Sequence, residues 1–136
     1  MRAQQEHRSP DTEHRHAGGL RRFEDLVAWQ KAHHLVLEIY RQTVSFPAGE
    51  KYGLVSQMRR AAVSVPANIA EGFKKRGARD KANFYNIAQG SLEELRYYVT
   101  LSRDLGYRVD HVRLGQLADD VGRLLHGLVR ATRADS

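Results

Sequence analysis

The sequence predicts an all-α protein, an antiparallel up-and-down four-helix bundle, and three observations lead there. Apolar residues recur at three- and four-residue steps in four successive segments. Short stretches that contain proline or glycine separate these segments. No segment shows the alternation of polar and apolar residues that is typical of a β-strand. Helices with short connections pack most readily beside their sequence neighbours, in antiparallel order.

The first helix is expected to begin near Phe23. Its apolar stripe, which should lie on one face of the helix, comprises Leu26, Trp29, His33, Val36, Leu37, Tyr40 and Val44. The stretch Phe46-Pro47-Ala48-Gly49 should end the helix, because proline disfavours helical backbone in the residue before it.

The second helix carries a stripe of apolar residues between Leu54 and Phe73. Pro66 lies inside this helix. Because proline removes one backbone hydrogen bond and crowds the preceding turn, we expect a kink there. Gly72 or Gly77 should end the helix.

Three polar residues, Gln57, Asn68 and Glu71, lie along this largely apolar helix. A buried carboxylate must be paired, hydrogen-bonded or protonated. We therefore interpret these residues as a polar lock that joins helices or subunits. A ligand site around Asn68 and Glu71 is the alternative.

Asp80, or a residue just before it, should open the third helix. Its apolar stripe comprises Phe84, Ile87, Ala88, Ser91, Leu92, Leu95, Tyr98, Val99, Ser102 and Leu105. Gly90 lies mid-helix, where glycine costs about 1 kcal/mol relative to alanine, so we expect it to permit close approach of a neighbouring helix. Tyr85 and Tyr97 lie off the stripe and suit subunit contacts, since tyrosine combines apolar area with a polar tip.

Gly106 is a suitable C-cap for the third helix, and Asp110 should cap the fourth. The apolar positions of the fourth helix are Leu114, Leu117, Val121, Leu124, Leu125 and Leu128. Across the whole chain, the residues that we expect in helix packing or at a subunit interface are Gln57, Asn68, Glu71, Gly72, Gly90, Ser91, Glu94 and Tyr97.

The chain has 136 residues, enough for one domain with a single core. We interpret residues 1–20, which are poor in apolar side chains, as a disordered tail and residues 21–132 as the bundle. Cysteine is absent, which excludes disulfides and thiolate metal sites. Without a run of about 18 apolar residues or a secretory signal, a cytoplasmic location is expected.

Catalytic and cofactor motifs are missing, so we expect no enzymatic activity, metal or cofactor. His33 and His34 point about 100° apart on a helix and cannot bind one metal from one face. Inward Glu-x-x-His pairs, which di-iron bundles require, do not occur. The Gly72 to Gly77 spacing lacks the Lys-Ser/Thr of a phosphate-binding loop.

The net charge is +6, and its excess is concentrated between residues 59 and 81. The basic residues of that window are Arg59, Arg60, Lys74, Lys75, Arg76, Arg79 and Lys81. Against them stand only Glu71 and Asp80, so the window alone carries +5. Such an excess attracts nucleic acid through phosphate contacts that carry no sequence information. The alternative is a solvated face that keeps the protein soluble.

Three stretches resemble a known family: FEDLVAWQKA (23–32), FPAGEKYGLVSQMRRAAVSVPANIAEG (46–72) and NFYNIAQGSLEELRYYVTLSRDLGY (83–107). This is the bacterial four-helix bundle protein family, whose founding members are encoded within intervening sequences of 23S ribosomal RNA genes. The resemblance implies a ring-like homopentamer with no established enzymatic activity. A related branch supplies the accessory protein of diversity-generating retroelements, a basic pentamer that binds a reverse transcriptase and nucleic acid.

Residues and resemblance together predict a non-enzymatic homo-oligomer, a pentamer by resemblance, that binds nucleic acid with weak sequence specificity. RNA is the favoured type. A fivefold ring would turn the +5 window into a band of about +25, in which phosphate contacts combine through avidity. The alternative is a protein-interaction scaffold for a partner enzyme such as a reverse transcriptase, with no direct nucleic-acid role.

Overall fold

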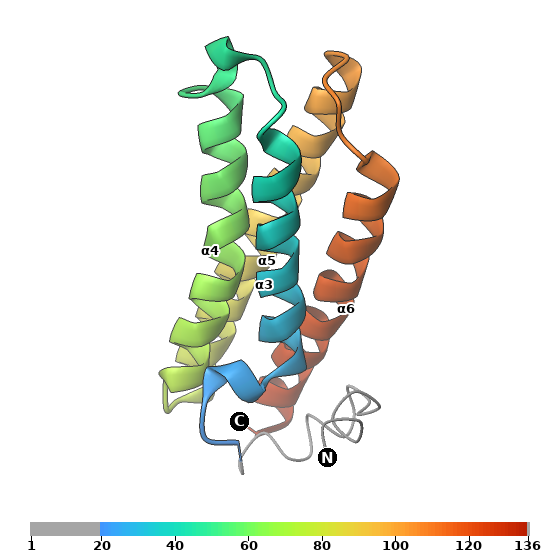
Figure 1. Cartoon of the computed structure of the whole chain (residues 1–136). Coiled ribbons are helices and arrows are strands. Elements are labelled where there is room, and N and C mark those ends of the chain that lie inside the picture. Colours follow the sequence, from blue (N-terminus) through green and yellow to red (C-terminus); the bar gives the residue numbers. More distant parts are fainter. Residues whose placement is uncertain (1–19, 136) are drawn as a thin grey trace.

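The computed structural model describes residues 20–135, and these form a four-helix bundle without a strand (Figure 1). Its helices are α3 (Val27–Thr43), α4 (Leu54–Lys74), α5 (Ala78–Asp104) and α6 (His111–Asp135), with short 3-10 helices η2 (Phe23–Asp25) and η3 (Ala48–Glu50). Successive helices run antiparallel, and α6 packs against both α5 and α3, which closes the bundle. The predicted fold class is confirmed.

Both turns that join α3 to α4 and α5 to α6 lie at one end of the bundle, whereas the α4–α5 turn and η2 lie at the other (Figure 1). The predicted tail falls, apart from Leu20, outside the described residues. The fourth helix extends beyond the predicted boundary at 132 to Asp135. No helix in the described part is long and apolar enough to cross a membrane.

Local capping signals are confirmed at the α5–α6 turn. Gly106 has φ +81°, a left-handed conformation that suits glycine, and its N–H donates to the Arg103 carbonyl. The N–H of Tyr107 donates to the Ser102 carbonyl, which completes a Schellman motif. Asp110 caps α6, because its carboxylate accepts from the Arg113 N–H at 3.1 Å.

The α4–α5 turn differs from its prediction by a few residues. Gly72 lies inside α4, which ends at Lys74, and Gly77 is the N-cap of α5. The helix therefore begins at Ala78, two residues before Asp80. The α4 helix continues through Pro66, and the kink expected there stays a prediction.

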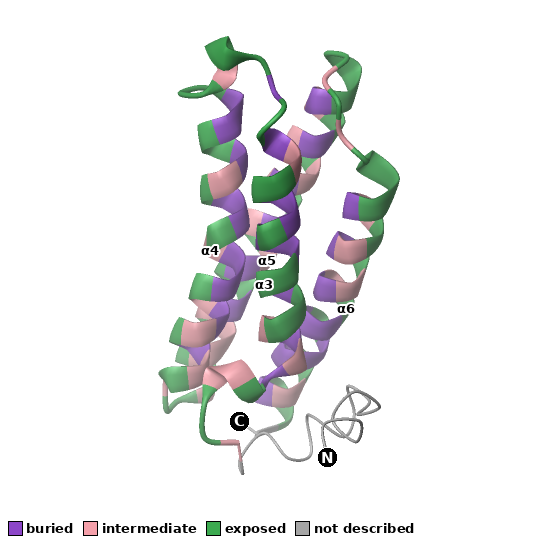
Figure 2. Cartoon of the chain, in the orientation of Figure 1, coloured by how far each residue is buried: buried purple, intermediate pink, exposed green. Residues whose placement is uncertain are grey.

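The core lies between the four helices, and the buried residues lie along the inward sides of the helices (Figure 2). On α4 the expected stripe is buried at Leu54, Met58, Ala61, Ala62, Val65 and Ile69. On α5 the buried positions are Tyr85, Ala88, Leu92, Leu95, Val99 and Ser102. Tyr85 is thus a core residue and was wrongly placed off the stripe, whereas Ile87 and Leu105 of the predicted stripe are exposed.

The predicted stripe of α3 is correct at Leu26 and Val36, which are buried, and wrong at four other positions. The helix buries Ala28, Ala32, Leu35, Val36, Glu38, Ile39 and Thr43. The residues His33, Leu37, Tyr40 and Val44, which we call the outer α3 face, are exposed. Large apolar side chains lie on both sides of this helix, and those that face the core are Leu35, Val36 and Ile39, beside the small Ala28 and Ala32. Periodicity alone does not decide between two apolar sides.

Candidate nucleic-acid interface

Two layers of polar contacts join α4 to α5. In the first, the half-buried Asn68 donates from Nδ2 to the Ser64 carbonyl at 2.8 Å and to Ser64 Oγ at 3.0 Å. Ser64 Oγ lies 2.8 Å from Ser91 Oγ across the two helices. Asn68, Ser64 and Ser91 thereby give one another hydrogen-bond partners at a partly buried position, where an unpaired polar group would be costly.

The second layer is centred on Glu94. Its Oε2 accepts from Arg60 Nη2 and from the Tyr98 hydroxyl, each at 2.6 Å. The Tyr98 hydroxyl, and after it Arg60, hold the pKa of Glu94 below its ordinary value, and the same hydrogen bond raises the pKa of Tyr98. Arg60 also donates to Gln57 Oε1 at 3.0 Å. The structure thus places Gln57, Asn68, Ser91 and Glu94 on one seam between helices.

Of the other residues that were expected in helix packing or at a subunit interface, Glu71, Gly90 and Tyr97 do not belong to this seam. Glu71 is exposed, with Lys75 Nζ 3.8 Å from its carboxylate, so it does not join helices within the chain, and its place at a subunit interface stays a prediction. Asn68 and Glu71 have separate partners among the described residues and form no joint site. Tyr97 is exposed, and a Cβ added at Gly90 would meet nothing within 4 Å, so Gly90 does not mark a close approach of helices within this chain.

Gly72 is a point of close packing between α4 and α5. A Cβ added there would lie 2.6 Å from Tyr85 Cε1 and 3.2 Å from Phe84 Cβ. Because Tyr85 is buried, its ring has little freedom to move aside. This position needs glycine for space rather than for a special backbone conformation.

We predict that Gly72→Ala lowers the free energy of unfolding by about 1–3 kcal/mol through overpacking. The matched variant Gly90→Ala should instead raise it by up to about 1 kcal/mol, because the added methyl meets open space and alanine favours the helix. Urea unfolding of both variants and the parent checks the opposite signs. A Gly72→Ala protein as stable as Gly90→Ala would contradict the packing interpretation.

Four of the seven basic residues that were predicted to bind nucleic acid make contacts with other residues of the chain. Arg59 Nε donates to Thr43 Oγ1 at 3.0 Å, and its guanidinium stacks over the Tyr40 ring, so it joins α4 to α3. Arg60 is bound to Glu94 across α4 and α5. Lys81 Nζ donates to the Phe73 carbonyl at 2.8 Å and satisfies the last turn of α4.

Lys75, the fourth, lies over the Phe84 ring at 5.0 Å and near Glu71. The remaining three, Lys74, Arg76 and Arg79, are exposed and form no ion pair within residues 20–135. They cluster around the α4–α5 turn. Their charge is therefore available to an external anion.

Arg21 extends this group of free cations. It lines an open hollow of about 400 Å³ together with Arg22, Phe23, Glu24, Ala70, Phe73 and Lys74. Arg22 forms an ion pair with Glu24, with 3.0 Å between Nη2 and Oε2. Arg21 is exposed and has no ion pair in the described part of the chain. We call Arg21, Lys74, Arg76 and Arg79 the basic end. The sequence window missed Arg21, because it lies 53 residues from Lys74 in the sequence.

A family model described as 23S rRNA-intervening sequence protein matches residues 24–127, from η2 to late in α6. The chain belongs to this family. No curated protein matches the chain.

Within this member of the 23S rRNA-intervening sequence protein family, the stretches that carried the resemblance meet in space. Gln57 to Gly72 lies on α4 and Ala88 to Leu95 on α5, and the two serve the seam between those helices. Their polar residues therefore hold helices together within the chain. The free cations of the α4–α5 turn lie just beyond the first of these stretches.

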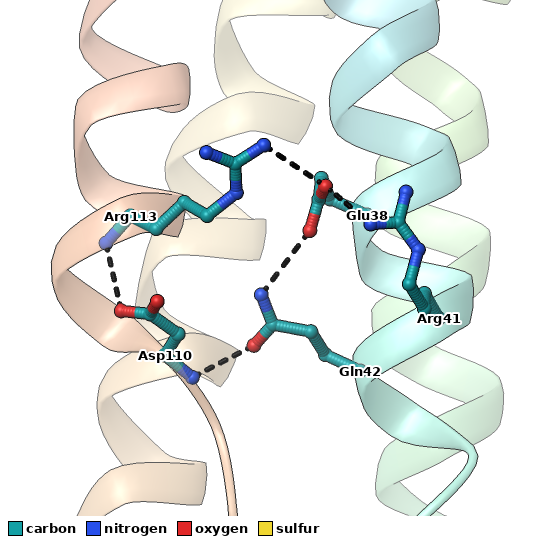
Figure 3. Close-up of polar contacts among 5 residues, drawn as sticks. All are labelled: Glu38, Arg41, Gln42, Asp110 and Arg113. Atoms are coloured by element: carbon teal, nitrogen blue, oxygen red, sulfur yellow. Dashed lines mark hydrogen bonds and ion pairs between the residues drawn. The ribbon is translucent and has the colours of Figure 1, made fainter.

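Sequence reasoning missed the most buried charge of the described structure, Glu38. Its side chain is 3% exposed, and its Oε2 lies 2.7 Å from Arg41 Nη1 and 3.1 Å from Arg113 Nη2 (Figure 3). Gln42 donates to its other oxygen at 3.3 Å and accepts from the Asp110 N–H at 2.7 Å. This network fixes α3 to the start of α6.

The guanidinium of Arg113, helped by Gln42 and Arg41, lowers the pKa of Glu38 to about 2, against the opposing effect of burial. The spacing of Glu38, Arg41 and Gln42 on one helix was a visible signal. The decisive partner, Arg113, is 75 residues away, which no local pattern indicates. In residues 20–135 no three His, Cys, Asp or Glu side chains are grouped so that they could hold a metal ion.

Proposed function

We propose that this protein is a non-enzymatic homo-oligomer that binds nucleic acid, RNA in particular, through the basic end and with weak sequence specificity. One observation carries this proposal: Lys74, Arg76 and Arg79 are exposed together without an ion pair among the described residues. The other four basic residues of the window already contact carboxylates, hydroxyls, carbonyls or aromatic rings of the chain. Fewer residues are therefore available to nucleic acid than a count of charges suggests.

The chemistry of the basic end favours phosphate over base recognition. Its cations are on exposed loops and helix ends, and long flexible side chains reach backbone phosphates without reading base edges. Each phosphate contact releases counterions, so affinity should fall steeply with salt. Repetition of the basic end in an oligomer would combine several weak contacts on one strand.

Self-association has its own support in the outer α3 face. Leu37 is 48% and Val44 75% exposed, and both lie on the same side of the helix as Tyr40. Large apolar side chains that recur along one exposed helix face are typical of protein contacts, since their burial removes apolar area from water. We assign this face to contact with further copies of the chain.

The test is binding of the purified protein to labelled single-stranded RNA and duplex DNA across a salt series, with its mass in solution measured in parallel. We expect an oligomer whose affinity for RNA falls steeply with salt and varies little with sequence. An oligomer that binds neither nucleic acid would overturn the proposal and favour a scaffold for a partner enzyme. A monomer would overturn the role of the outer α3 face.

A further inference from the structure

A cavity of about 160 Å³ lies between α3, α5 and α6, toward the end of the bundle that carries the α5–α6 turn. Its apolar wall is formed by Leu35, Ile39, Leu95, Val99, Leu114 and Ala118. For comparison, an engineered cavity of about 150 Å³ in another protein stays dry and takes up benzene. The space therefore suits one compact apolar group of that size.

The polar residues that line the same cavity are all hydrogen-bond donors or hydroxyls: Arg96, Thr100, Arg103 and His111. No Asp or Glu is among the described residues that line it. Arg103 contacts Asp104, its sequence neighbour, at 3.1 Å and is about half exposed. The cavity thus combines an apolar interior with positively charged groups in its wall.

Arg96 adds an independent observation. Its Nη2 lies 3.0 Å from Asp119, and its Nε lies 3.2 Å from Glu93. That Nε is nevertheless buried and makes no hydrogen bond in the described structure. A buried donor without an acceptor is costly, and a turn of the Arg96 side chain toward an oxygen of a molecule in the cavity would satisfy it.

We propose that this cavity binds a small carboxylic acid with a compact apolar body, of the size of benzoate. The ring or branched chain fills the apolar interior, and the carboxylate accepts hydrogen bonds from Arg96 and Arg103, near His111. A hydrogen bond to a charged donor favours such a ligand over a neutral one of equal size. This site is separate from the basic end and does not depend on the nucleic-acid proposal.

The experiment titrates the full chain with benzoate, benzyl alcohol and benzylamine and follows backbone amide shifts by NMR. We expect saturable shifts with benzoate for residues of α3, α5 and α6 around the cavity. Benzoate should bind about tenfold more tightly than benzyl alcohol, and benzylamine should not bind measurably. Equal binding of all three probes, or no binding of benzoate, would overturn the proposal.

Two pairs of variants locate the ligand. Arg103→Gln should weaken benzoate binding about tenfold and leave benzyl alcohol unchanged, whereas Arg130→Gln, at an exposed and distant position of α6, should change neither. Gly115→Leu should abolish the binding of both, because a Cβ at Gly115 of the cavity wall meets nothing within 4 Å and the leucine can enter the space.

The control for the filled cavity is Gln116→Leu, an exposed position one residue further along α6 that points about 100° away. Replacing a helical glycine removes a cost of about 1 kcal/mol, so Gly115→Leu should remain folded, and its unfolding curve checks this. A folded Gly115→Leu protein that binds benzoate as the parent does would place the ligand elsewhere and refute the site.

Discussion

Replacement of both Lys74 and Arg76 by glutamate is expected to weaken RNA binding roughly 10- to 100-fold at moderate salt, because two cations that would face phosphates become anions. The slope of log affinity against log salt should become shallower by roughly one for each phosphate that a protomer no longer neutralises. Both side chains are exposed and without ion pairs in the described residues, so the bundle should keep its thermal stability. Fluorescence anisotropy across a salt series measures the effect.

The control is a second double variant, Lys51→Glu with Arg108→Glu, which changes the net charge equally. Both positions are exposed and lie at the opposite end of the bundle, near the α3–α4 and α5–α6 turns. We expect a small loss of affinity there, from the general change in charge. Equal losses in the two variants would show that the affinity for RNA depends only on the net charge of the protein. An unchanged affinity after replacement of Lys74 and Arg76 would refute the proposal that the basic end binds RNA.

Glu38→Gln is expected to lower the free energy of unfolding at pH 7 by roughly 2 kcal/mol, because it removes a buried carboxylate from between two guanidinium groups. The decrease stays below that of a fully buried pair, since Arg41 and Arg113 are exposed enough to regain water. Exposed Glu71, paired only with Lys75, provides the comparison, and Glu71→Gln should cost well under about 1 kcal/mol. Urea unfolding at constant pH measures both.

The same residue should leave a signature in the pH dependence of stability. The folded pKa of Glu38, about 2, lies below its ordinary value of 4.5, so the ionised form is bound more strongly in the folded state. Its contribution is fully present above about pH 4.5 and is lost as the pH falls through about 2. The parent should therefore lose stability more steeply than Glu38→Gln over that range. Parallel pH profiles for the two proteins would contradict the role of the network.

The bundle was predictable because its signals are local. Apolar periodicity, the proline after Phe46, and the caps at Gly106 and Asp110 each depend on residues a few positions apart. The register of α3 was not predictable in this way. Leu37 and Val44 are as apolar as Leu35 and Ile39, so the sequence does not show which side of the helix is buried, and in the structure only Leu35 and Ile39 face the core.

The sequence by itself determined that the chain is helical, that it carries a basic segment around the α4–α5 turn, and which family it resembles. Tertiary structure alone decided which charges are free, because ion pairs depend on distances between residues that are remote in the chain. Arg60 is neutralised by Glu94, 34 residues away, and Glu38 is held by Arg113, 75 residues away. Arg21 joins Lys74 only because the chain entering α3 and the end of α4 lie side by side. The sequence gives the total charge of a segment. The packing of the helices decides which of its charged side chains are left unpaired and can bind a partner.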